Sequence, residues 1–104
     1  MKRLYEMHAD LCKAFSNPTR LEILNLLRNK ELSVTELVEK TKLSQANISQ
    51  HLSIMRSKGI VTSRRKGKGI YYRLTTQKII EAFDMIREVL AAKITENRKI
   101  IAKL

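Results

Sequence analysis

The pattern that most restricts the fold of this chain is a helical segment followed at once by two strand-like segments with a short glycine-containing connection. Residues 60–64 and 70–74 are rich in β-branched and aromatic side chains, and the tip between them reads Lys66-Gly67-Lys68-Gly69. Just before them, apolar residues recur at steps of four and three, the spacing of one buried helix face: Ile48, Leu52 and Met55. This order predicts a mainly α-helical domain with a small β-hairpin.

Three more helices are expected before this helical segment. Apolar residues at three- and four-residue steps from Leu4 to Phe15 predict a first helix that ends near Ser16 and Asn17. Asn17 and Pro18 then form a start signal for a second helix, because proline at the first helical position loses no hydrogen bond. The buried face expected for that helix consists of Leu21, Leu24 and Leu27.

The third and fourth helices are predicted to form a helix-turn-helix. Ser33-Val34-Thr35-Glu36 has the sequence of a capping box, and a turn is expected at residues 41–43. Ser44 is then expected to cap the fourth helix, and Gly59 to end it in a left-handed conformation. Two short helices joined by a tight turn are typical of DNA-binding proteins.

The C-terminal segment predicts a long helix that one small domain cannot cover. After a cap at Thr75 or Thr76, an apolar stripe runs along one side of residues 77–104: Ile79, Phe83, Ile86, Leu90, Ile94 and Ile101. At 104 residues we expect one winged helix-turn-helix domain, residues 1–104, whose first and last helices pair with those of a second copy. Residues 77–104 are thus expected to be a dimerisation helix.

The charge of the chain is concentrated in one window. Residues 40–80 contain ten of the 21 Lys and Arg residues and none of the ten acidic ones, so they hold +10 of the formal net charge of +11. Such a basic surface favours a polyanionic partner, and double-stranded DNA is the partner that fits a helix followed by a basic hairpin.

Two groups of candidate DNA-binding residues follow. On the fourth helix, polar side chains are expected to face outward, where amides and hydroxyls can bond to base edges: Ser44, Gln45, Asn47, Ser49, Gln50 and His51, with Arg56 further along. At the hairpin, cations are expected to contact phosphates: Arg64, Arg65, Lys66 and Lys68. Glutamine and asparagine suit adenine, which favours an A·T-biased half-site.

Three separated motifs resemble the ArsR/SmtB family of winged-helix repressors: Phe15 to Leu24, Ser44 to Leu52, and Gly59 to Val61 with Tyr71 to Leu74. The resemblance covers roughly residues 8–80 and implies a homodimer that represses by binding an imperfect inverted repeat. This chain departs from the family at Lys42, where a glycine is common. It also lacks the usual metal-ligand sets, since the corresponding positions hold Ser33, Thr35, Thr76, Lys78, Val89 and Ala92.

Several alternatives remain open from the sequence. His8 and Cys12 lie four residues apart on one helix face and could join a dimeric metal site or act in redox sensing, although a packed structural role is more common for a lone cysteine. A nucleoid protein that coats DNA without an operator is a second alternative. With two His and one Cys, no nucleophile and base pair indicates an enzyme, and no cofactor is expected. No secretion signal or membrane span is evident, so we expect a cytoplasmic protein.

Overall fold

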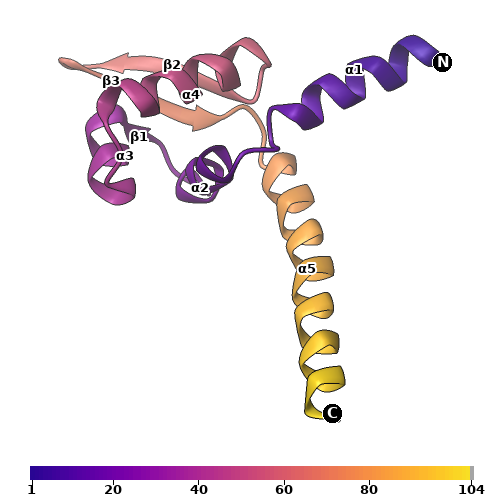
Figure 1. The fold of residues 1–104 in the computed structure, drawn as a ribbon. Coiled ribbons are helices and arrows are strands. Elements are labelled where there is room, and N and C mark those ends of the chain that lie inside the picture. Colours follow the sequence, from indigo (N-terminus) through magenta and orange to yellow (C-terminus); the bar gives the residue numbers. More distant parts are fainter. Residues whose placement is uncertain (104) are drawn as a thin grey trace.

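The computed structural model describes residues 1–103, which form five helices and one small sheet (Figure 1). The elements follow the order α1 (Lys2–Lys13), α2 (Pro18–Leu26), β1 (Leu32–Ser33), α3 (Val34–Thr41), α4 (Gln45–Ser57), β2 (Val61–Lys66), β3 (Gly69–Leu74) and α5 (Lys78–Ala102). The predicted mainly helical fold with a β-hairpin is confirmed. A third strand, β1, was not predicted, and it makes the sheet antiparallel with strand order β1-β3-β2.

The helix start signals in the sequence act as predicted at three places. Asn17 Oδ1 accepts a hydrogen bond from Arg20 N at 3.1 Å at the start of α2. Ser33 and Glu36 form the reciprocal capping box of α3, with both bonds at 3.1 Å. Ser44 Oγ accepts from Asn47 N, also at 3.1 Å, at the start of α4. These bonds satisfy backbone donors that a helix would otherwise leave unpaired, and they fix where the helix-turn-helix begins.

Lys42, in the turn between α3 and α4, adopts a backbone conformation that favours glycine. Its φ of 64° lies in the left-handed region, which a glycine would adopt without steric cost. The turn is supported by Thr41, whose hydroxyl donates to Leu37 O at 2.7 Å and accepts from Leu43 N. The backbone strain at Lys42, about 1 kcal/mol or more, is therefore offset by the surrounding structure.

Two sequence-based predictions about helix detail were wrong. Leu21 is exposed on α2, and Ile23 takes the place expected for it in the core beside Leu24 and Leu27. The start of α5 also differs, because Thr75 does not cap it: its hydroxyl donates to Gly59 O at 2.8 Å and closes the base of the hairpin. The helix begins after Gln77, which makes no side-chain cap, while Thr76 Oγ1 accepts from Lys78 N at 3.3 Å.

The core lies between α2, α3, α4 and one face of the sheet. Its fully buried side chains include Ile23, Leu24, Leu27, Leu37, Ile48, Leu52 and Met55. Figure 1 shows α1 and α5 projecting away from this body in different directions. The radius of gyration is 16.5 Å, whereas a compact domain of this length would have about 13 Å. The projecting helices account for the difference.

The two projecting helices expose the apolar side chains that the sequence placed on one face. None of the residues of α1 is buried, and α5 buries only Ile80. Ile86 is 71% exposed and Leu90 is 56% exposed in the single chain. Within residues 1–103, none of the helices combines the length and apolar composition that crossing a membrane requires.

The first turns of α5 are nevertheless bonded to the turn that follows α2. Arg28 donates to both carboxylate oxygens of Asp84, at 2.8 and 2.7 Å, and its guanidinium lies 5.9 Å from the centre of the Phe83 ring. The hydrogen bond from Arg28 lowers the pKa of Asp84, because it stabilises the charged form of this carboxylate. The long helix therefore leaves the body of the protein in a fixed direction.

Candidate nucleic-acid interface

Helix α4 is held against the core by three side chains and defined at both ends. Ile48, Leu52 and Met55 have no exposed surface, as their spacing predicted. Gly59, with φ of 74°, follows the helix, and Ile60 N donates back to Met55 O at 2.9 Å in the expected left-handed ending. The orientation of α4 about its own axis is therefore fixed, and so is the face that it presents to solvent.

The exposed face of α4 carries the predicted polar side chains. Gln45, Asn47, Ser49 and Gln50 are all exposed, and within residues 1–103 none of their side chains makes a hydrogen bond. Ser44 is also exposed, although its oxygen already serves as the helix cap. Their donors and acceptors are thus available to a ligand that fits a helix face.

The structure adds Ser53 to this face. Ser53 is exposed and follows Ser49 and Gln50 at the four- and three-residue spacing that places side chains together on a helix. Helical periodicity could have identified it from the sequence. Arg56, also exposed, lies one turn further along, where a cation can contact a phosphate.

His51 is the one predicted residue of α4 that lies partly inside the fold. Arg20 Nη1 is 3.4 Å from His51 Nδ1, while Arg20 Nε donates to Ala14 O at 2.7 Å. Arg20 therefore connects the end of α1 to the middle of α4, a contact between residues 31 positions apart that the sequence did not indicate. Burial, and secondarily the charge of Arg20, lowers the pKa of His51 from its ordinary value near 6.5.

We expect this histidine to make folding stability depend on pH. The unfolded chain binds the His51 proton more readily than the folded one, so the stabilising effect is complete above the unfolded pKa near 6.5 and is lost as pH falls from there through the lower folded pKa. Urea unfolding at about pH 7.5 and about pH 5.5 should show a smaller loss of stability on acidification for His51→Gln than for the wild type. Equal losses in the two proteins would contradict this assignment.

The hairpin of β2 and β3 has a two-residue loop, Gly67-Lys68. Lys66 pairs with Gly69, and Gly67 has φ of 62°, the conformation that a tight hairpin turn requires at its first loop position. Gly69 does not have a positive φ, so only Gly67 serves the turn as predicted. The cations are divided by the alternation of the strands: Arg64 and Lys66 lie on one face, Arg65 on the other, and Lys68 at the tip.

Three of the four hairpin cations are free of acidic partners within residues 1–103, and the fourth is not. Arg65, Lys66 and Lys68 are exposed and make none of the ion pairs described there; Lys66 Nζ lies 5.9 Å from the centre of the Tyr71 ring. Arg64 instead donates to the carboxylate of Glu31. The sequence did not indicate this partner of Arg64, and the contact of Arg64 with DNA stays a prediction.

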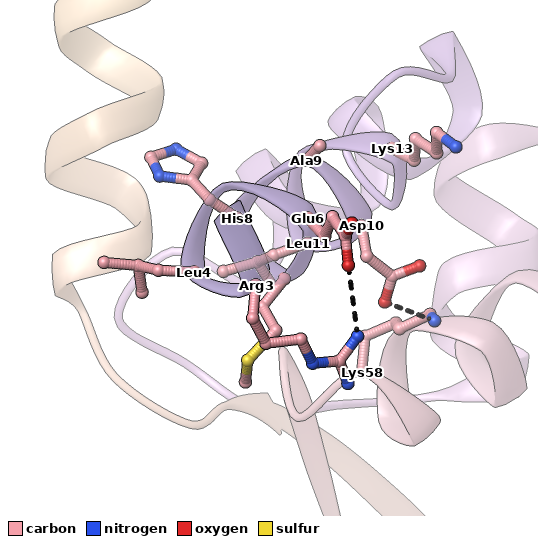
Figure 2. Close-up of a pocket in the computed structure, with 10 residues that line it drawn as sticks. Arg3, Leu4, Glu6, His8, Ala9, Asp10, Leu11, Lys13 and Lys58 are labelled. Atoms are coloured by element: carbon pink, nitrogen blue, oxygen red, sulfur yellow. Dashed lines mark hydrogen bonds and ion pairs between the residues drawn. The ribbon is translucent and has the colours of Figure 1, made fainter. Parts of the chain in front are cut away.

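The alternative sensing residues, His8 and Cys12, are both exposed on α1. His8 lines an open groove of about 880 Å³ beside α1, which also contains Leu4, Met7 and Leu11. Figure 2 shows His8 pointing away from the ion pair of Asp10 with Lys58, whose atoms lie 2.7 Å apart. Among residues 1–103, no group of three or more His, Cys, Asp or Glu side chains is placed to hold a metal ion.

These features together define a class of protein. A helix-turn-helix whose second helix exposes amides, followed by a basic β-hairpin beside it, is a winged helix-turn-helix DNA-binding domain. The class explains why the basic window coincides with α4 and the hairpin. The hairpin (residues 61–74) is called the wing from here on.

Known proteins with similar sequences and structures identify the family. Residues 17–63 match the family described as "Bacterial regulatory protein, arsR family". The HTH-type transcriptional regulator Rv0081 of Mycobacterium tuberculosis is 32% identical over 102 residues, 97% of this chain and 90% of that protein. Its crystal structure has a TM-score of 0.83, covering 90% of this chain and 95% of that one. This chain therefore belongs to the arsR family of bacterial transcriptional regulators.

Two further similarities are informative about this family. The biofilm growth-associated repressor of Xylella fastidiosa strain 9a5c is 37% identical over 92 residues, 88% of this chain and 80% of that protein. The solution structure of Mb0332 from Mycobacterium bovis, a homodimeric winged helix-turn-helix DNA-binding domain, has a TM-score of 0.82 at 28% identity, covering 91% and 88% of the two chains. Transcriptional regulators of this kind are normally not enzymes.

Proposed function

We propose that this protein is a homodimeric repressor that binds an inverted-repeat DNA operator, with one half-site contacted by each subunit. The observation that carries the proposal is the exposed face of α4, where exposed amides and hydroxyls lie beside a cationic wing. A helix of this diameter fits the major groove of B-form DNA. The similarity to the repressor of Xylella fastidiosa supports repression as the direction of control.

In this proposal the polar side chains of α4 read the bases. Gln45, Asn47 and Gln50 each offer both a donor and an acceptor, the combination that adenine requires at N6 and N7. Ser44, Ser49 and Ser53 add hydroxyls that adapt to either role. His51 acts from the side of the helix, since its Nδ1 already faces Arg20. We therefore expect A·T pairs at the centre of each half-site.

The wing and Arg56 supply contacts to the sugar-phosphate backbone. Arg65, Lys66 and Lys68 are exposed and lie close together at the tip of the hairpin. Contacts of this kind determine the register and orientation of a protein on the duplex but carry no sequence information. They also make binding dependent on salt, because each neutralised phosphate releases counterions.

Dimerisation through α1 and α5 explains the apolar surface that the single chain leaves exposed. Leu4, Met7 and Leu11 on α1 and the stripe on α5 would lose contact with water against the same elements of a second copy. A dimer also brings two α4 helices to successive turns of the duplex, which matches an inverted repeat. We assign residues 1–104 to one domain on this basis, with the dimerisation helix extending through the described end of α5.

The proposal is tested by capturing genomic fragments with the purified protein and footprinting the retained sites. A repressor should protect discrete inverted repeats that resist competition by a random duplex at moderate salt. A nucleoid protein that coats DNA would give uniform protection, and random duplex would compete equally. The second result would contradict sequence-specific recognition.

Gln50→Ala should relax base preference at defined positions of each half-site. Gln50 lies on the outward face of α4 without a hydrogen-bond partner within residues 1–103, so its loss should cost roughly 1–3 kcal/mol of discrimination. Binding to a library of operator variants would measure the change. Lys66→Ala is the matched comparison, and it should weaken all sequences alike while reducing the salt dependence by about one unit. The same profile for both variants would contradict the division into reading and positioning residues.

A further inference from the structure

One cation of the wing is already bound to an acidic residue of the same chain. Glu31 immediately precedes β1, and the strand order β1-β3-β2 brings it across β3 to Arg64. Arg64 Nε lies 3.0 and 2.9 Å from the two carboxylate oxygens of Glu31, and Arg64 Nη2 donates to Oε1 as well. The guanidinium thus uses one whole edge, Nε with Nη2, to hold the carboxylate.

The same edge of an arginine is the one that holds a phosphate. Carboxylate and phosphate oxygens both accept two parallel N–H bonds from a guanidinium, so the two anions compete for the same donors. Arg64 forms this pair on the outer face of the sheet, in register with Tyr71 and two residues before Lys66. If the wing contacts the duplex as proposed, Glu31 occupies an edge of Arg64 that a phosphate would need.

The pair is poorly explained by a need for stability. Its side chains are 56% exposed for Arg64 and 23% exposed for Glu31, and pairs this accessible to water usually contribute little to folding. The hydrogen bond from Arg64, with help from the charges of Lys66 and Arg73, lowers the pKa of Glu31. The carboxylate is therefore charged at neutral pH and acts as a permanent competitor.

We propose that Glu31 is an internal substitute for a DNA phosphate: it occupies Arg64 and so lowers the affinity of the wing for any duplex, whatever its sequence. This inference rests on the proposed contact between the wing and DNA. One masked cation per wing reduces the phosphate-driven part of binding, which is the part that random DNA shares with an operator. A regulator that must leave random DNA to find its sites benefits from that reduction, because the base contacts of α4 then supply a larger share of its affinity.

The test uses a random-sequence duplex of about 30 bp, long enough for more than two helical turns, so that no operator has to be known. Binding of the full chain is measured by fluorescence anisotropy between about 0.05 and 0.2 M salt. Glu31→Gln should raise the affinity several-fold and steepen the salt dependence by about 0.9 units for each wing that contacts the duplex. Arg64→Gln alone should change the affinity by less than about two-fold, since its guanidinium is already occupied.

The double variant Glu31→Gln with Arg64→Gln separates masking from a general change in charge. It should lose most of the gain seen for Glu31→Gln, because no guanidinium remains to be released. Glu39→Gln is the matched control: Glu39 is exposed on α3, forms none of the ion pairs described for residues 1–103, and its substitution changes the net charge equally. It should change affinity and salt dependence much less.

Two results would overturn the inference. Unchanged binding by Glu31→Gln would show that Arg64 does not reach the duplex, and weaker binding at an unchanged melting temperature would show that the pair holds the wing in its binding position. If the wild-type protein bound neither the random duplex nor its own genomic DNA, the proposed function itself would fail, and that outcome is distinct from either of the first two.

Discussion

Leu90→Asp should reduce affinity for an operator with two half-sites by about 100-fold or more, and it should do so by separating the two subunits. Leu90 lies in the middle of the apolar stripe of α5, about 18 Å along the helix from its start, and is 56% exposed in the single chain. A carboxylate at this position would have to be buried without a partner if the dimer formed. The two half-sites would then be bound independently, without the effective concentration that a linked pair provides.

The control for this variant is Thr95→Asp, which places the same charge on the same helix, about 140° around its axis from Leu90. Within residues 1–103 the Thr95 hydroxyl bonds to Ala91 O of its own helix, at 3.0 Å, and to no other group, so its loss should leave the dimer intact. Analytical ultracentrifugation of the three proteins gives the oligomeric state, and titration of one and two half-sites gives the affinities. A dimeric Leu90→Asp protein with unchanged operator binding would exclude α5 from the interface.

The helices were largely predictable because their signals are local. Asn17, Ser33 and Ser44 each bond to a backbone amide three residues ahead, so a short stretch of sequence contains the whole interaction. The buried face of α4 follows in the same way from its periodicity. Strand β1 was missed because two residues, Leu32 and Ser33, are too few to show an alternating pattern, and the strand exists only through its pairing with Tyr72 and Tyr71.

The residues of the candidate site were predictable, but the contacts that some of them make with distant parts of the chain were not. The exposed amides of α4 and the cations of the wing could be named from spacing alone. The partner of Arg64 could not, because Glu31 is 33 residues away and reaches it only through the order of the strands. The contact of Arg20 with His51 is equally non-local. In both cases a charged or titratable side chain has a tertiary partner that changes what it can do.

Leu52→Ala should produce the largest loss of folding stability among these variants, about 2–5 kcal/mol. Leu52 is fully buried between Ile48 and Met55 on the inner face of α4, and its truncation leaves a cavity that the sheet and neighbouring helices can fill only in part. Small domains have a total stability of about 5–15 kcal/mol, so this one change removes a large fraction of it. Urea unfolding at fixed protomer concentration measures the loss, since a dimer gains stability with concentration.

Ser53→Ala, at the next residue of α4, is the control for the loss of stability expected from Leu52→Ala. Ser53 is exposed, one residue from Leu52, and its change should alter stability by no more than about 0.5 kcal/mol. Under the proposed function it should instead alter DNA binding, because Ser53 shares the outward face with Ser49 and Gln50. A loss below about 1 kcal/mol for Leu52→Ala would mean that α4 is not anchored through this side chain. The exposed face of α4 would then not be fixed in the orientation on which base recognition depends.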